Sequence, residues 1–196
     1  MRVTAALGVA LALTPPSLAA GGSYVFVGGT SYERQQVTQA LAASSFDWSA
    51  VPQTVTITIQ PNVVSQAVPG HIWLDSNLLD SGEFSWGVVQ NEYAHQVDFY
   101  LLDDLQRAQL TSALGAAAWC YGDAAGLTLE QYGCERFAST LAVAYWQSPY
   151  NCIGATSDVA PIAPAAFRAL LVSLIGPAAR PAASTEHLNG TRRRTI

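Results

Sequence analysis

Residues 54–60 read Thr-Val-Thr-Ile-Thr-Ile-Gln, a strict alternation of polar and apolar residues that constrains the fold more than any other segment. A period of two places all the apolar side chains on one face of a β-strand. Residues 23–27 and 71–75 are short, rich in β-branched and aromatic residues, and adjacent to the turn-forming pairs Gly28-Gly29 and Pro69-Gly70. We therefore predict three short strands that form a small sheet.

Helical signals dominate the remaining sequence. Thr30 and Glu33 have the spacing of a capping box, which predicts a helix that ends near Ala43. A second capping box begins at Thr128, and Asp104 is a suitable N-cap residue. Further helices are predicted over residues 81–103, 105–114, 128–146 and 164–175. The order strand, helix, strand, strand and then helices predicts an α+β domain, in which helices that include residues 81–103 back a small mixed sheet.

The N-terminal residues have the pattern of a secretory signal. Arg2 precedes an apolar run over residues 3–14, and the small residues Ser17 and Ala19 favour cleavage nearby. This run is shorter than the roughly 20 residues that a membrane span needs, and Pro15-Pro16 interrupts it. We therefore predict a signal peptide at residues 1–20, a secreted protein and no stable membrane anchor. The domain is expected at residues 21–178, followed by a flexible tail at 179–196 that is rich in Pro, Ala and Arg.

The charge of the chain argues against nucleic acid as a partner. Asp and Glu together number 14 against nine Arg and no Lys, and the formal net charge is −5. The one basic cluster, Arg192-Arg193-Arg194, lies in the predicted tail. Binding to phosphates needs a basic surface on the folded domain. We expect a monomer that does not bind nucleic acid.

Three cysteines, Cys120, Cys134 and Cys152, leave room for one disulfide and one thiol. Secretion would permit a disulfide, and any of the three pairings is compatible with the sequence. A bridge between Cys120 and Cys134 would staple the loop before a predicted helix, and we favour that pairing. A cysteine–histidine hydrolase is disfavoured because no nucleophile signature surrounds these residues.

The segment Asn91-Glu92-Tyr93-Ala94-His95 is the most informative for function. Positions four apart on a helix share a face, so the side chains at 91 and 95 point the same way and Glu92 lies one step around. Two histidines at this spacing with a glutamate after the first are typical of a helix that binds Zn²⁺ and activates water. In this chain the first ligand position holds an asparagine.

Residues 92–99, Glu-Tyr-Ala-His-Gln-Val-Asp-Phe, resemble the zinc-binding helix of the zincin metallopeptidases, whose motif is His-Glu-x-x-His. Glu135, within Gly-Cys-Glu-Arg-Phe-Ala at 133–138, is similar to the third zinc ligand of the gluzincin branch, a glutamate on a later helix. The predicted strand at 71–75 resembles the sheet edge that lines a zincin cleft. The resemblance covers roughly residues 24–145 and implies a zincin-like sheet, a zincin-like domain and a Zn²⁺ cofactor.

The resemblance assigns a role to each matching residue. Glu92 matches the general base, and His95 and Glu135 match two of the zinc ligands. Asn91 stands at the first ligand position, where an amide oxygen is a weaker donor than an imidazole nitrogen. His71 would replace the missing ligand if its strand borders the cleft; otherwise it is a surface residue at the start of a strand.

Other residues near the motif have alternative interpretations. Glu130 is a second candidate for the third ligand, although acids in the first turn of a helix often stabilise its dipole. Tyr121, Tyr132 and Tyr145 are candidates for a hydroxyl that stabilises an oxyanion, although aromatic residues in helices usually belong to the core. Asp98 is expected to support the site or pack the helix rather than to bind metal.

We expect a secreted, zinc-dependent, metallopeptidase-like protein that hydrolyses a peptide or protein substrate, with a metal site impaired by Asn91. The main alternative is a catalytically inactive zincin-fold pseudoenzyme that acts as an extracellular binding or structural module. A third hypothesis is a secreted domain unrelated to the zincins. A structure that placed His95 and Glu135 on separate surfaces would favour it.

Overall fold

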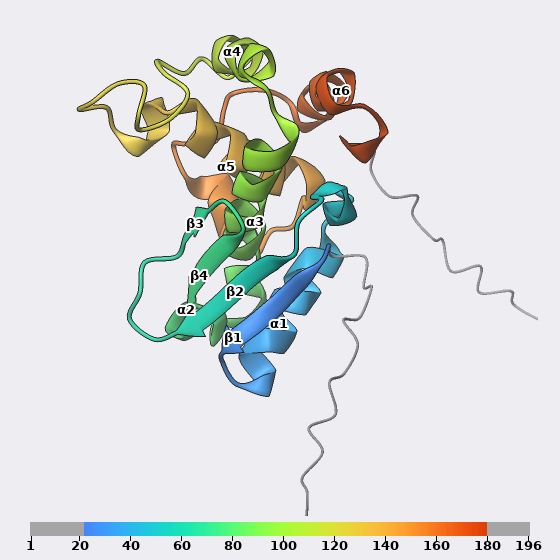
Figure 1. Ribbon diagram of the computed structural model, residues 1–196, viewed down its shortest axis with the longest axis vertical. Helices are drawn as coiled ribbons and strands as arrows, with labels where there is room; N and C mark the ends of the chain where they lie inside the picture. The colour runs from blue at the N-terminus through green and yellow to red at the C-terminus, as the bar shows by residue number, and fades with distance from the viewer. Residues whose placement is uncertain (1–21, 180–196) are drawn as a thin grey trace, which may run out of the picture.

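The computed structural model describes residues 22–179 and contains a four-stranded sheet and six helices within that range (Figure 1). The elements are β1 (Tyr24–Gly28), α1 (Ser31–Ala43), β2 (Val55–Gln60), β3 (Gln66–Val68), β4 (His71–Asp75), α2 (Ser76–Leu79), α3 (Trp86–Leu101), α4 (Asp104–Ala113), α5 (Gly133–Tyr145) and α6 (Pro164–Ile175). The predicted α+β class and the sheet backed by helices are confirmed.

The sheet is mixed, with strand order β1-β2-β4-β3. The strand β2 pairs in parallel with both β1 and β4, whereas β3 pairs antiparallel to β4. The three predicted strands are confirmed, but β3 was not predicted from the sequence. Its three residues are too few for an alternating pattern to be recognisable. Because β3 is the last strand in the sheet, one of its edges has no strand partner among the described residues.

The alternation in β2 sets which face of the sheet is covered. Val55, Ile57 and Ile59 are buried, as are Ile72 and Leu74 of β4. These five side chains meet the helices that pack on one face of the sheet. The threonines of β2 lie on the other face and are only partly covered.

Local capping explains where the helices begin, with three differences from the sequence-based expectation. The capping box of Thr30 at α1 is present. At α4 the N-cap is Asp103 rather than Asp104, because the Asp103 carboxylate accepts from the backbone N–H of Gln106 at 2.8 Å. The predicted helix at 81–103 begins as a short 3₁₀ turn before α3 starts at residue 86. The Thr128 capping box likewise opens a 3₁₀ turn at 129–131, and α5 begins at residue 133.

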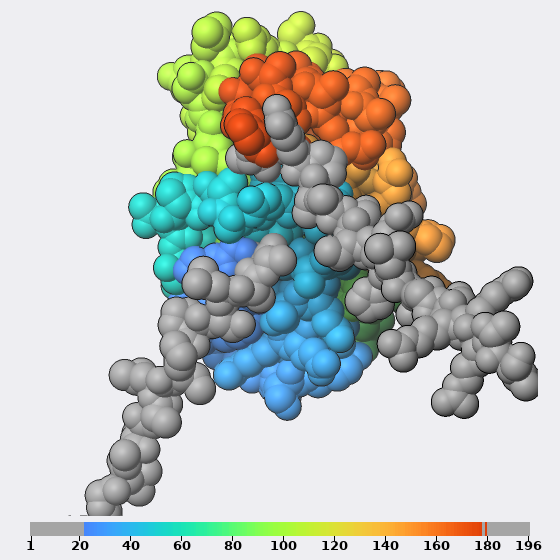
Figure 2. All heavy atoms as spheres, turned by 90° about the vertical axis from the view of Figure 1, so that its right-hand side faces the viewer, coloured from blue at the N-terminus to red at the C-terminus, as the bar shows by residue number. Residues whose placement is uncertain are grey.

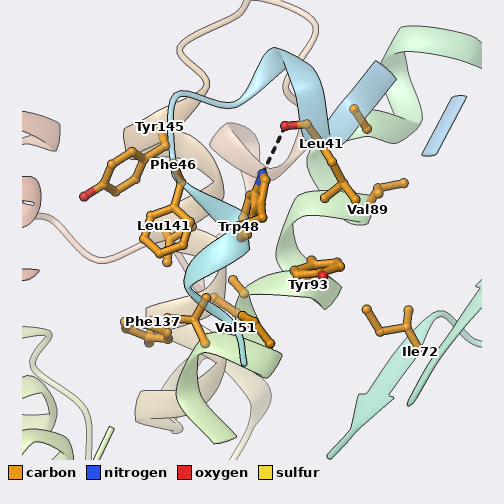
Figure 3. Close-up of a cluster of buried hydrophobic side chains, with 14 of the residues drawn as sticks. Leu41, Phe46, Trp48, Val51, Ile72, Val89, Tyr93, Phe137, Leu141 and Tyr145 are labelled. Atoms are coloured by element: carbon orange, nitrogen blue, oxygen red, sulfur yellow. Dashed lines mark hydrogen bonds between the residues drawn. The ribbon is translucent and has the colours of Figure 1, made fainter. Parts of the chain in front are cut away.

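The main core lies where α1, α3 and α5 meet the sheet (Figure 3). Trp48, Tyr93 and Phe137 are fully buried in it, and the indole N–H of Trp48 donates to the carbonyl of Leu41 at 3.0 Å. Truncating one such aromatic side chain to Ala typically costs about 3–5 kcal/mol. The helix α3 runs through this core and is buried over nearly its whole length from residue 89 to 98. Its polar residues at 90–92, 95, 96 and 98 are therefore held in a rigid environment.

The two helices α4 and α6 lie side by side at one end of the molecule (Figure 2). The side-chain amide of Gln106 in α4 donates to the carbonyl of Leu174 in α6 at 2.7 Å. No helix within residues 22–179 has the length and apolar character that a bilayer crossing requires. The predicted signal peptide at 1–20 lies outside the described residues, as does the predicted tail at 179–196 apart from Ala179.

Candidate functional site

The helices α3 and α5 bring His95 and Glu135 together. The Nε2 atom of His95 lies 3.7 Å from Oε2 of Glu135. His95 is buried in the middle of α3, and Glu135 lies in the first turn of α5 with a partly covered side chain. Separate surfaces for these two groups would have favoured an unrelated domain, and the structure instead places them 3.7 Å apart.

These two residues and Glu92 line one cleft of about 530 Å³. This size falls within the range of about 300–1,000 Å³ that is usual for small-ligand sites. The other lining residues come from the β3 edge, the end of α3 and the segment before α5; they are Val64, Ser65, Gln66, Ala67, Phe99, Cys120, Tyr121 and Leu129. The cleft therefore combines two carboxylates and an imidazole with walls of both apolar and polar side chains.

Gln96 holds the β3 edge beside the cleft. Its side-chain oxygen accepts from the backbone N–H of Gly70 at 2.8 Å, and its side-chain nitrogen donates to the carbonyl of Val68 at 2.9 Å. The two bonds attach the β3–β4 turn to the residue that follows His95. Gly70 has φ = +76°, a conformation that favours glycine in this turn. Gln96 was not predicted from the sequence, because a fully buried glutamine in the middle of a helix becomes informative only once its partners are known.

Among the three tyrosine candidates, Tyr121 lies at the site. Its hydroxyl donates to Oε1 of Glu135 at 2.6 Å. The hydroxyl of Tyr132 instead donates to the carbonyl of Ala124, and that of Tyr145 to the carbonyl of Ala179. Tyr132 and Tyr145 therefore bond to the backbone away from the cleft and support the fold.

A disulfide joins the two chain segments that carry Tyr121 and Glu135. Cys120 and Cys134 are bonded, with their Cα atoms 5.5 Å apart, and each immediately precedes one of these site residues. The favoured pairing is confirmed, and Cys152 is a free, exposed thiol. The disulfide thus holds the Tyr121 segment against the start of α5.

Asn91 does not contribute to the wall of the cleft. Its side-chain nitrogen donates to the hydroxyl oxygen of Ser139 at 3.0 Å, and that hydroxyl donates its proton to Asp158 at 2.8 Å. Because a serine hydroxyl has a single proton, Ser139 can only accept from Asn91, and this defines the orientation of the amide. Asn91 therefore joins α3 to α5 and to the segment around Asp158.

Two other candidate ligands lie away from the cleft. The ring of His71 is 2.9 Å from the hydroxyl of Thr58 and stacks on Trp73, with centroids 3.9 Å apart. These side chains belong to the face of the sheet opposite the buried face, so the structure does not bring His71 to His95. Glu130 is exposed in the 3₁₀ turn before α5 and is not among the cleft residues.

Burial and mutual interactions shift the pKa of each cleft group. Burial raises the pKa of Glu92 to about 7; His95 opposes this shift and Glu135 adds to it. Burial alone would lower the pKa of His95, but the adjacent Glu135 raises it above its usual value. Burial alone would raise the pKa of Glu135, but His95 and Tyr121 lower it below its usual value. The cleft therefore favours an ion pair between His95 and Glu135, beside Glu92 with a pKa of about 7.

Comparison of the chain with protein-family models, curated proteins and solved structures finds no match. The interpretation of the cleft therefore depends on its residues and distances.

The cleft fits a divalent cation only in part. Zinc bonds to His nitrogen and carboxylate oxygen are about 2.0–2.2 Å long, so two such donors on one ion lie no more than about 4.3 Å apart. The 3.7 Å between His95 and Glu135 satisfies this limit. However, within residues 22–179 no group of three or more His, Cys, Asp or Glu side chains is placed to hold a metal ion. The pair supplies two donors, and the usual third protein ligand of a catalytic zinc site is missing.

Proposed function

We propose that the protein is a secreted, zincin-like hydrolase that cleaves peptide bonds in the cleft between β3 and α5, with a divalent cation bound weakly. The observation that carries this proposal is the 3.7 Å approach of His95 to Glu135 in the same cleft as Glu92. Nothing in the local sequence requires two residues 40 positions apart to meet. Their meeting in a cleft supports a shared chemical role.

The free edge of β3 supports an extended peptide as the substrate. Residues 64–67 line the cleft, and β3 has a strand partner only on its β4 side among the described residues. An edge strand offers unpaired N–H and C=O groups that can pair with an added peptide strand. A peptide paired there would lie alongside Glu92 and His95.

Glu92 is the residue best suited to accept a proton from water. A buried carboxylate with a pKa of about 7 is a stronger base than an ordinary glutamate and is still partly ionised at neutral pH. His95 and Glu135 would hold the cation, which when bound lowers the pKa of a coordinated water. Tyr121 orients Glu135 through their 2.6 Å hydrogen bond.

A second candidate function is peptide binding without hydrolysis. It is favoured by Asn91, because the amide is engaged with Ser139 and the position offers no strong third ligand. A cleft that binds peptide but retains no cation would act as a binding module.

Incubation of the purified protein with a mixture of unstructured peptides, followed by mass spectrometry, tests both functions. The hydrolase proposal predicts new peptide termini when zinc is supplied, and their loss with chelator and in Glu92→Gln. Glu130→Gln, which alters an exposed glutamate outside the cleft, is the matched control and should leave cleavage unchanged. Peptide retention without new termini would indicate the binding module. Cleavage that persists in Glu92→Gln would contradict the assigned role of Glu92.

A further inference from the structure

Three consecutive residues before α5 are each anchored to a different partner. The indole N–H of Trp119 lies 3.2 Å from both carboxylate oxygens of Asp98. Cys120 forms the disulfide to Cys134, and Tyr121 donates to Glu135. The first of these anchors is on α3, and the other two are on α5. The segment 119–121 therefore bridges the two helices that carry the site.

Asp98 is placed to determine where this segment lies. It follows His95 by three residues, so it lies about one helical turn further along α3. Its side chain is buried, and it accepts from Nε of Arg107 at 2.8 Å as well as from Trp119. Arg107 donates in addition to the backbone carbonyl of Asp98 at 2.9 Å. A buried carboxylate that accepts hydrogen bonds from two sides is held rigidly. It therefore fixes the position of the Trp119 indole that donates to it.

We propose that Asp98 is a positioning residue of the cleft: through the indole of Trp119 it holds Tyr121 on Glu135. Besides the disulfide, two backbone bonds hold this segment to the start of α5: the N–H of Cys134 donates to the carbonyl of Trp119 at 2.7 Å, and the N–H of Gly133 donates to the carbonyl of Ala118 at 2.8 Å. The Asp98–Trp119 bond adds an attachment to α3, which neither the disulfide nor these backbone bonds supply. Asp98 thereby links the helix of His95 to the residue that orients Glu135. The proposal rests on the proposed function, since it concerns the same cleft.

The chain contains a matched control for removal of the Trp119 N–H. The indole N–H of Trp86 donates to the side-chain oxygen of Gln36 at 2.9 Å, between α3 and α1 and away from the cleft. Trp119→Phe and Trp86→Phe each delete one indole donor that has a side-chain acceptor. Any general effect of losing a tryptophan N–H will appear in both variants. Asp98→Asn keeps the size of Asp98 and serves as a second variant should Trp119→Phe not fold.

The first measurement is the ring signal of Tyr121 in the NMR spectrum of protein with isotope-labelled tyrosine. The signal is identified by its disappearance in Tyr121→Phe. We expect it to shift toward the position of a solvated tyrosine in Trp119→Phe and in Asp98→Asn, and to stay in place in Trp86→Phe. This measurement needs neither activity nor a cation, so its outcome is separate from that of the proposed function. An unchanged Tyr121 signal in Trp119→Phe and Asp98→Asn would show that the attachments to α5, the disulfide and the backbone bonds, suffice, and would overturn the proposal.

The second measurement is a double-mutant cycle on the apparent affinity for zinc, by calorimetry. Residues that orient metal ligands typically affect metal affinity about 10–100-fold. If Trp119 acts through Tyr121, then Trp119→Phe, Tyr121→Phe and the double variant should lose affinity by the same factor, about 10-fold. If Trp119 instead affects zinc affinity independently of Tyr121, the factors by which the two single variants lose affinity should multiply in the double variant. That result would overturn the proposal.

Discussion

The side-chain amide of Asn91 donates to the hydroxyl of Ser139 at 3.0 Å, and the direction of this bond follows from the bond between Ser139 and Asp158. The residue four positions before His95 thus has a structural partner on α5. This hydrogen bond between α3 and α5 gives the Asn91 amide a structural role that involves no metal. Position 91 therefore offers no strong donor to a cation in the cleft.

Asn91→His should raise the affinity for zinc at least 10-fold. The substitution supplies an imidazole on the same helical face as His95, and zinc prefers His nitrogen to an amide oxygen. Calorimetric titration of both proteins measures the change. Asn91→Ala, which also loses the bond to Ser139 but adds no ligand, is the control and should not gain affinity. Equal affinities for the wild type and Asn91→His would contradict the placement of residue 91 at a ligand position.

Glu92→Gln should abolish peptide hydrolysis and leave zinc affinity within about threefold of the wild type. The amide keeps the shape of the side chain but cannot accept a proton from water at neutral pH. Product formation and calorimetry on the same preparations separate the two effects. A loss of zinc binding equal to the loss of turnover would make Glu92 a ligand instead of a base.

The stability of the chelator-treated protein should fall as pH rises from about 5 to 8. The pKa of Glu92 is raised from 4.5 to about 7, so over this interval the folded state holds a proton that the unfolded state has released. The raised pKa of His95 acts in the same direction, because the stability it contributes is lost as His95 deprotonates. Full ionisation of Glu92 costs about 3 kcal/mol by the standard conversion. Thermal unfolding measured across this pH range should show a shallower decline in stability for Glu92→Gln than for the wild type. Identical stability profiles for the two proteins would contradict the raised pKa of the buried Glu92 carboxylate.

The bounds of several elements could be predicted because their signals are local. Pro164 at the start and Gly176 after the end define α6, and the alternation at residues 54–60 defines β2. The strand β3 escaped prediction because its pairing with β4, rather than its own three residues, makes it a strand. For the same reason the partners of Gln96 and Asp98 could not be identified from the sequence, since they lie 9–28 residues away along the chain.

The site was predictable to the extent that it resembles a known motif. Spacing on one helix placed Glu92 and His95 close together, and resemblance alone pointed to Glu135. The position of His71 could not be deduced, because which face of β4 it occupies depends on the register of the strand. The disulfide pairing was also open, because spacing does not determine which cysteines meet in space.

Loss of the disulfide should lower the free energy of unfolding by about 3 kcal/mol and leave the fold intact. The bridge closes a loop between cysteines 14 residues apart, and a loop of that size contributes about 3 kcal/mol by restricting the unfolded chain. The main core around Trp48 and Phe137 is packed from apolar side chains of the helices and the sheet, and we expect it to persist without the bridge. Denaturant unfolding of the double variant Cys120→Ser/Cys134→Ser measures the change, with Cys152→Ser as the control. A loss of all secondary structure in the double variant would be inconsistent with this account.

The most direct test is to soak crystals of the protein in zinc and locate the metal by its anomalous scattering. We expect one peak within about 2.2 Å of both Nε2 of His95 and a carboxylate oxygen of Glu135, in the cleft that contains Glu92. A well-ordered crystal with no anomalous peak between these two side chains at saturating zinc would contradict this expectation.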